Sequence, residues 1–205
     1  MKMNNTIQDL QRYWQGLTIA MQKMPFHLLE QMVELLFDCY QRGNTVFVMG
    51  NGGSAATASH FACDLAKGTR MPGLPAFRVI SLNESIPQMT AWANDTSYER
   101  IFAEQLAALV RPDDLVIVLS GSGNSPNVIA AALEAHQNNA FVIALTGKTG
   151  GRLADLADLL IRVPAQPIEQ VEDAHLTIAH SLCVVLRERL RALATERLER
   201  ATTVP

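Results

Sequence analysis

The sequence predicts a single doubly wound α/β domain with a five-stranded parallel sheet, preceded by an N-terminal pair of helices. Two observations carry this expectation. Five short segments are apolar along their whole length, which is typical of parallel strands covered on both faces. Helical stretches separate them, so each strand is expected to reach the next through a crossover helix. At 205 residues the chain is long enough to bury the core of such a domain.

The first 43 residues precede the first strand and are expected to form two amphipathic helices. Pro25 separates two apolar series, of which the second runs from Leu28 to Gly43, a favourable helix end. The first series has helical spacing and consists of Ile7, Leu10, Trp14, Leu17 and Met21. This pair either mediates oligomerisation or packs on its own domain, and the pattern leaves both uses open.

From residue 44 onward, strands and helices alternate. The expected strands lie at 45–49, 77–82, 114–120, 140–146 and 158–163. The expected helices between them lie at 54–67, 86–109, 124–138 and 150–157, and a long amphipathic helix follows at 168–195. The expected organisation is therefore a helical unit (1–43), the α/β domain (44–195) and a polar tail (196–205).

Composition excludes several classes of protein. The net charge of −3 gives no basic footprint for nucleic acid. No apolar run approaches the roughly 20 residues that span a bilayer, and the N-terminus lacks the apolar core of a signal peptide. The three cysteines, Cys39, Cys63 and Cys183, show no CxxC spacing and so predict neither a disulfide framework nor a zinc knuckle. We expect a cytoplasmic protein without nucleic-acid or membrane partners.

Two polar loops follow predicted strands, at the edge where ligands bind in sheets of this kind. The first, 50–54, reads GNGGS and opens a helix, so that backbone amides can approach an anion closely. It fits only a permissive form of the dinucleotide fingerprint and lacks the lysine of a P-loop. The second, 120–125, reads SGSGNS, and its three hydroxyls can hold a phosphate monoester without lysine or arginine. Asn124 or Ser125 could instead be a simple helix cap, but a cap requires one such residue.

Ionisable side chains suggest a metal site. His60 and Asp64 are four residues apart on one predicted helix and share a face. Glu172 and His180 are eight apart on the last helix, roughly 80° beyond two full turns, so both can face one cleft. Two histidines and two carboxylates suit a divalent cation, with zinc first. His175 lies between them and is expected to support the ligands from behind.

The chain resembles sugar-isomerase-domain proteins, and their phosphoheptose isomerase branch, over about residues 44–190. Five segments carry the resemblance: GNGGSAATASHFACDL (50–65), WANDTSYERIF (92–102), LSGSGNSPNVIAA (119–131), LTGKTGGRLADLADLLIRVP (145–164) and QVEDAHLTIAH (170–180). The resemblance implies a flavodoxin-like sheet and a homotetramer with shared active sites. It also implies a metal-assisted aldose–ketose isomerase that interconverts sedoheptulose 7-phosphate and D-glycero-D-manno-heptose 7-phosphate through a cis-enediol.

The resemblance also implies a set of site residues. The substrate would contact Asn51, Gly52, Gly53, Ser54, Asp64, Asn94, Asp95, Ser120, Gly121, Ser122, Ser125 and Glu172. The metal ligands would be His60, Asp64, Glu172 and His180. In this scheme His180 and either Asp64 or Glu172 move the protons.

Three departures from the family pattern stand out. The family usually has Glu at the position of Asp64 and Gln at that of Glu172, and a family arginine falls near Gly68. The sequence therefore leaves open a substrate other than the heptose phosphate.

The main alternative function is that of a non-catalytic sugar-isomerase-domain protein, either a partner of a replication initiator or a sugar-phosphate sensor. Such partner proteins tend to lose the histidine equivalent to His180, whose presence favours an enzyme. A dinucleotide-dependent oxidoreductase would need an acidic residue at the end of the second strand, where the chain has Asn83.

Overall fold

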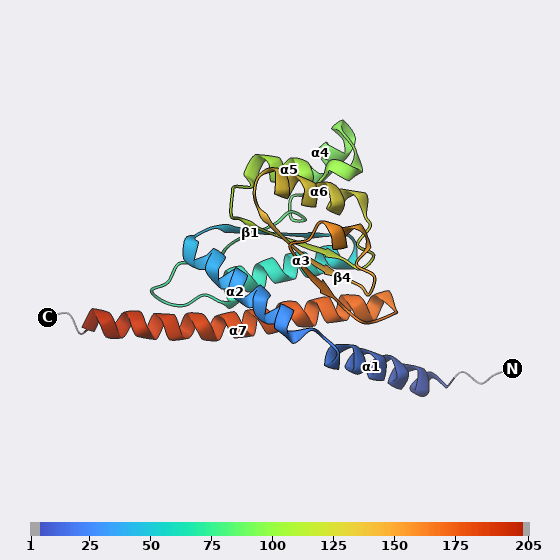
Figure 1. The fold of residues 1–205 in the computed structure, drawn as a ribbon, viewed down its shortest axis with the longest axis horizontal. Helices are drawn as coiled ribbons and strands as arrows, with labels where there is room; N and C mark the ends of the chain where they lie inside the picture. Colours follow the sequence, from blue (N-terminus) through green and yellow to red (C-terminus); the bar gives the residue numbers. More distant parts are fainter. Residues whose placement is uncertain (1–4, 203–205) are drawn as a thin grey trace.

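The computed structural model describes residues 5–202 and shows one parallel sheet between two layers of helices (Figure 1). The strand order is β2-β1-β3-β4-β5, and every neighbouring pair is parallel. This confirms the predicted doubly wound, five-stranded fold. The strands are β1 (Thr45–Gly50), β2 (Arg78–Ser81), β3 (Leu115–Ser120), β4 (Phe141–Thr146) and β5 (Leu159–Arg162). Because β2 and β3 flank β1, the strand order reverses between β1 and β3, where a ligand crevice is expected.

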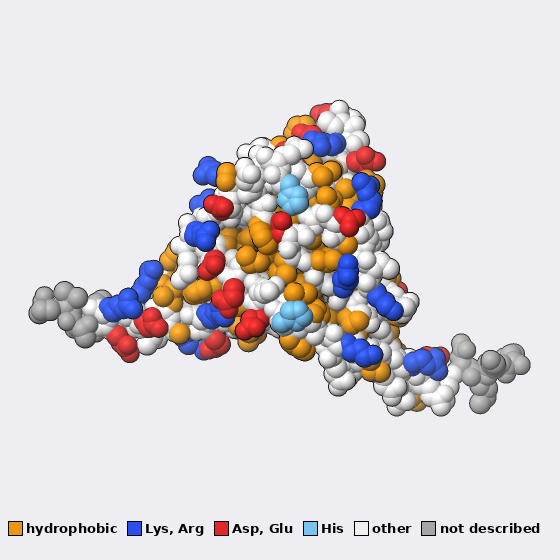
Figure 2. Space-filling model, in the orientation of Figure 1, with side chains coloured by type: hydrophobic (Ala, Val, Ile, Leu, Met, Phe, Trp, Pro, Cys, Tyr) orange, Lys and Arg blue, Asp and Glu red, His pale blue; other side chains and the backbone are white. Residues whose placement is uncertain are grey.

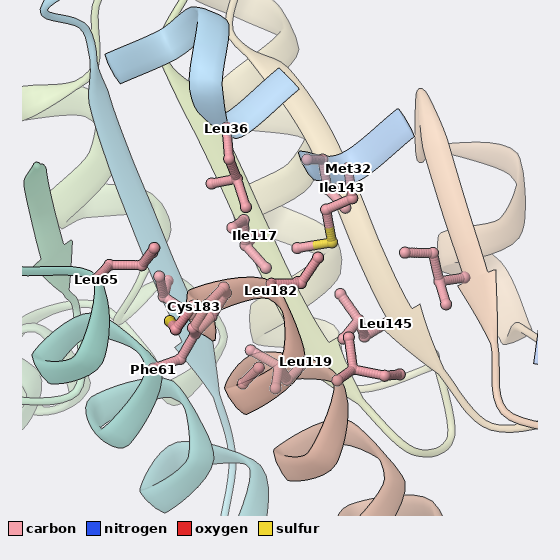
Figure 3. Packing of buried hydrophobic residues seen from close by; sticks show 14 of the residues in the cluster. Met32, Leu36, Phe61, Leu65, Ile117, Leu119, Ile143, Leu145, Leu182 and Cys183 are labelled. Carbon is pink, nitrogen blue, oxygen red and sulfur yellow. The ribbon is translucent and has the colours of Figure 1, made fainter. Parts of the chain in front are cut away.

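Alternation along the strands divides the core into two clusters. Val48 and Ile117 face one side of the sheet, under α2 (Phe26–Arg42), α3 (Gly53–Cys63) and α7 (Ile168–Thr202). Figure 3 shows this cluster, in which Met32, Phe61 and Leu182 meet the strand side chains. The intervening residues face the opposite side, under α5 (Ala103–Leu109) and α6 (Pro126–Gln137). A strand that is buried on both faces explains the continuous apolar runs of the sequence.

The two N-terminal helices differ in their packing. Met32 and Leu36 place α2 in the core, and Gly43 ends it in a left-handed conformation with φ of 72°. By contrast, α1 (Thr6–Gln22) buries only Ala20, and its first apolar series is largely exposed. The hydroxyl of Tyr13 donates a hydrogen bond to the carboxylate of Asp173 on α7, which raises the pKa of Tyr13 to about 12. In Figure 1, α1 and the C-terminal half of α7 extend from the domain in opposite directions.

Three predicted helices differ from the observed ones. The helix expected at 86–109 is broken into α4 (Ile86–Asp95), the 3₁₀ turn η2 (Tyr98–Arg100) and α5. The break falls where Ser97 is extended and the hydroxyl of Thr96 bonds to the carbonyl of Trp92, a local competitor of the helix. At 150–157 the chain forms only the short 3₁₀ helix η3 (Gly151–Asp155). Gly150 and Gly151 have positive φ values, so a regular helix cannot begin at residue 150. The last helix does not stop at 195 but runs to Thr202.

The surface carries charged side chains of both signs (Figure 2). Lysine and arginine side chains are intermixed with acidic ones on the face seen in Figure 2, without a basic stripe. Among the described residues, the helices are all too short or too polar to cross a bilayer.

Candidate active site

A cavity of about 200 Å³ lies at the carboxyl edge of the sheet, beside the point where the strand order reverses. The glycine loop after β1, the serine loop after β3 and the first turns of α7 enclose it. Its lining residues are Asn51, Ser54, Leu119, Ser120, Gly121, Ser122, Ser125, Ile168 and Glu172. The two polar loops singled out in the sequence therefore meet in one pocket.

The serine hydroxyls are free to donate to a ligand. Ser120 Oγ and Ser122 Oγ each accept a backbone N–H, from Gly123 and Asn124, at 3.2 Å, so each hydroxyl proton remains available. Ser125 begins α6 but makes no side-chain capping bond. Asn124 does not cap the helix either, since its side-chain oxygen accepts the N–H of Arg152 at 3.0 Å. Ser125 therefore occupies the N-cap position of α6 without a side-chain capping bond, and all three serines line the cavity.

The glycines that follow β4 brace the serine loop from behind. Gly151 has a φ of 54°, and a Cβ there would lie 2.4 Å from the carbonyl oxygen of Ser122. The amide of Gly147 donates to the carbonyl of Gly121 at 3.0 Å. This close backbone contact gives a structural reason for the GKTGG sequence at 147–151 and fixes the position of the hydroxyls.

Three metal-ligand side chains converge at the end of α3. His60 Nε2 and His180 Nε2 are 3.1 Å apart, and they lie 3.5 and 3.7 Å from Asp64 Oδ2. Tetrahedral zinc with bonds of 2.0–2.2 Å would separate its ligands by about 3.4 Å, so the triangle matches the edge lengths that zinc requires. All three side chains are partly exposed, which leaves room for an exchangeable ligand. The three side chains could hold a divalent metal ion and leave one coordination position open.

Glu172 does not belong to this triangle. It lies in the cavity, with its carboxylate against Gly53, where a Cβ would meet Oε2 at 2.4 Å. The helical rise explains the separation: eight residues advance about 12 Å along the axis. The prediction of a shared site considered only the angle between Glu172 and His180 around the helix axis, and this rise along the axis was not included. Of the four expected ligands, the single chain brings together His60, Asp64 and His180.

The segment between α3 and β2 carries two of the three family departures, at Asp64 and near Gly68. Asp64 begins a π-helical turn, η1 (Asp64–Gly68), a local widening that is frequent at functional sites. The guanidinium of Arg187 from α7 lies against Gly68, and its Nε donates to the Gly68 carbonyl at 2.6 Å. A positive charge thus lies against Gly68, the residue near which a family arginine falls in the sequence, but it comes from another helix. The sequence offered no local signal for it.

Other site residues show mixed outcomes. Asn94 and Asp95 are exposed at the end of α4, where they bond to each other at 2.8 Å, and they do not line the cavity.

His175 is buried, its Nε2 lies 3.4 Å from the carbonyl of Thr146, and its Nδ1 has no partner among the described residues. Burial lowers the pKa of His175 to about 4, so its ring is neutral. The sequence missed Asn127, a buried amide that is hydrogen-bonded to Asn51 at 2.8 Å.

Comparison with known proteins identifies the class. Residues 13–147 match the SIS domain family, and this match covers more than half of the chain. The chain therefore belongs to the SIS-domain family.

Individual relatives narrow this assignment. A phosphoheptose isomerase from Laribacter hongkongensis is 40% identical over 168 residues, which cover 80% of this chain and 85% of that protein. One from Geotalea daltonii is 42% identical over 161 residues, with 78% and 82% covered. The solved structure of a phosphoheptose isomerase from Francisella tularensis superposes with a TM-score of 0.83 at 31% identity, covering 90% of this chain and 99% of that one. Within the SIS-domain family, the chain belongs to the phosphoheptose isomerase branch.

Proposed function

We propose that this protein isomerises a phosphorylated sugar between its aldose and ketose forms, and that its substrate pair is sedoheptulose 7-phosphate and D-glycero-D-manno-heptose 7-phosphate. The observation that carries the proposal is that α3 and α7 connect a hydroxyl-lined phosphate pocket to a group of metal ligands. Glu172 meets Gly53 at the pocket, and His180 meets His60 further along both helices. The two helices therefore run side by side in the same direction. The names of the relatives support the reaction type.

The spacing between pocket and ligands suits a sugar of this length. Seven residues separate Gly53 from His60, and eight separate Glu172 from His180, which corresponds to about 10–12 Å of helix. That distance is comparable to an extended open-chain sugar of seven carbons. With its phosphate held by the serine loop, the carbonyl end would reach the three ligands. Anchoring of the distal phosphate orients the reacting carbons.

The chemistry follows from the ligand triangle. A divalent cation, for which zinc is our proposal, would be held by His60, Asp64 and His180 and would supply Lewis acidity at the sugar carbonyl. Asp64 directs Oδ2 into the triangle, so Oδ1 can carry the proton between C1 and C2. His180 would hold the cation rather than exchange protons itself. Glu172, at the phosphate end, would accept a hydrogen bond from the sugar hydroxyl nearest to the phosphate.

Oligomerisation and location are part of the same proposal. The exposed apolar stripe of α1 and a groove of about 550 Å³ between α2 and α7, lined by Phe26, Leu29, Val33 and Val185 among others, support a homo-oligomer, for which we propose a tetramer. Asn94 and Asp95, exposed and outside the cavity, would contact the sugar once it extends beyond the pocket. Family membership supports a cytoplasmic location.

The test is a panel of five- to seven-carbon sugar phosphates, assayed with and without chelator. We expect turnover of sedoheptulose 7-phosphate, loss of that turnover with chelator, and solvent deuterium at C2 of the product. His180→Ala should bind less zinc and turn over at least 100-fold more slowly. A parent protein that binds sugar phosphate but neither retains metal nor turns over would favour the non-catalytic binding role.

A further inference from the structure

The glycine loop after β1 is held from both sides by asparagine side chains. On the β2 side, Asn83 Oδ1 accepts the N–H of Gly50 at 3.2 Å, and Asn83 Nδ2 donates to the Gly50 carbonyl at 2.9 Å. On the α6 side, Asn51 and Asn127 form a reciprocal pair: each Nδ2 donates to the Oδ1 of the other, at 2.8 Å in both directions. These bonds tie the ends of β2 and β1 to the start of α6, across the point where the strand order reverses.

Asn51 also binds a third segment. The hydroxyl of Tyr98 donates to Asn51 Oδ1 at 3.2 Å. A carbonyl oxygen has two lone pairs, and both on Asn51 Oδ1 are now used, by Asn127 and by Tyr98. One N–H of Asn51 Nδ2 has no partner among the described residues. Asn51 therefore has no remaining capacity to accept a hydrogen bond from a sugar hydroxyl, although the cavity reaches it.

The partners of Asn51 belong to two functional segments. Asn127 lies two residues after Ser125, in the first turn of α6, and is 1% exposed. Tyr98 follows α4, a helix without a fully buried residue, which ends with Asn94 and Asp95. The contact between Tyr98 and Asn51 is thus a side-chain link from this exposed segment to the pocket.

We propose that Asn51 is a positioning residue whose side-chain oxygen is fully engaged within the protein, and that Asn127 and Tyr98 are positioning residues with separable roles. Asn127 aligns the serine loop with the amides that open α3, and so sets phosphate affinity. Tyr98 fixes the α4–η2 segment, and so affects the sugar but not the phosphate. This inference rests on the proposed function, because it assigns the cavity to a phosphate and the α4 end to the sugar.

The experiment measures two quantities on the full chain: the Kd of inorganic phosphate, by ³¹P NMR titration, and the KM for sedoheptulose 7-phosphate. Asn127→Ala removes both bonds of the reciprocal pair, and we expect it to raise the phosphate Kd about tenfold. Tyr98→Phe removes one hydroxyl; we expect the phosphate Kd to stay within twofold and the KM to rise about fivefold. Asn51→Ala combined with Asn127→Ala should weaken phosphate binding no more than either single change, because the pair acts as a unit.

Matched controls separate positioning from general destabilisation. Asn138→Ala removes side-chain bonds to Glu134 at the far end of α6, and Tyr40→Phe removes a hydroxyl bond to the carbonyl of Pro75. Both should leave the phosphate Kd and the KM unchanged. If Asn127→Ala fails to fold, the uncharged and similarly sized Asn127→Leu takes its place, since it removes both bonds of the pair without adding a charge near the phosphate.

The outcomes distinguish these positioning roles from the proposed function. A parent that binds no phosphate and turns over no sugar would overturn both. A parent that binds phosphate, beside a folded Asn127 variant that binds it equally well, would overturn the positioning roles alone. So would a Tyr98→Phe protein whose phosphate Kd rises as much as that of Asn127→Ala, because the two roles would then not be separable.

Discussion

Removing the negative charge of Glu172 should strengthen phosphate binding. Glu172 lines the same cavity as the serine hydroxyls, and within residues 5–202 no lysine or arginine lines that cavity. A bound phosphate would therefore lie beside a carboxylate without a compensating side-chain cation. Glu172→Gln keeps the shape of the side chain and removes only its charge, which makes it the sharpest perturbation of the pocket.

The size of the effect follows from the dimensions of the cavity. A cavity of about 200 Å³ is about 7 Å across if it is spherical. Two unit charges at about 7 Å repel by ~0.6 kcal/mol in water and by ~2.4 kcal/mol at an effective dielectric constant of 20. Glu172 is half-buried, so a value between these limits applies, and we expect about tenfold tighter binding of inorganic phosphate to Glu172→Gln.

The assay is a titration of metal-free protein with inorganic phosphate at low ionic strength, repeated in 1 M salt. The high salt concentration should reduce the increase in phosphate affinity that Glu172→Gln produces, because the screening length falls to about 3 Å. Glu169→Gln is the control, since Glu169 is exposed three residues earlier on α7 and does not line the cavity. A Glu172→Gln protein within twofold of the parent at low salt, or an equal gain in Glu169→Gln, would show that the carboxylate does not face the anion.

Three further predictions concern the metal, the loop and pH. Asp64→Asn should reduce bound zinc, measured after dialysis, from about one per chain to well below half, whereas unchanged zinc would contradict the ligand triangle. Gly151→Ala should cost about 1–3 kcal/mol in urea unfolding and weaken phosphate binding, because its Cβ would meet Ser122; Gly43→Ala, which has a positive φ but no neighbour within 4 Å, should show the strain alone. Burial lowers the pKa of His175 to about 4, so the unfolded chain takes up the proton first and stability falls as the pH drops below about 6.5. Between pH 7.5 and 5 that loss should be about 2 kcal/mol, and a stable His175→Gln variant whose stability falls equally would contradict it.

The sheet could be predicted because the strands are buried on both faces. Val48 and Ile117 face one cluster while the residues between them face the other, so each strand is a continuous apolar run that the sequence displays directly. The helix at 86–109 could not be predicted to break, because its break depends on local bonds at Thr96 and on the docking of Tyr98 against Asn51. The spacing of apolar residues along the sequence indicates which positions are buried, but it does not reveal such individual contacts.

The two polar loops of the candidate site could be predicted from the sequence, but the residues that contact them could not. Hydroxyl and glycine content marked both loops, since few structures require so many such residues after a strand. Asn127 had no such signal, because an amide in the first turn of a helix is ordinary until its partner is known. Glu172 shows a different limit: rotation about the helix axis was considered, but the axial rise of about 12 Å to His180 was not. The position of Arg187 against Gly68 depends on how α7 packs and cannot be inferred from local sequence.

The parallel course of α3 and α7 has a consequence for substrate length. In the proposed function, the serine loop would hold one end of a sugar phosphate, and the His60–His180 contact, about 10–12 Å further along the helices, would mark where its carbonyl reacts. A sugar two carbons shorter, held by the same phosphate, would leave its carbonyl short of the ligands, and misplacement of this order is costly to catalysis. We therefore expect kcat/KM to decrease from seven- to six- to five-carbon ketose phosphates, by at least tenfold over the series, while their affinities as competitive inhibitors stay within a few-fold, because the phosphate contacts are shared. Equal kcat/KM across the series would mean that the helices do not set this distance, and that the sugar reacts at a position nearer to Glu172.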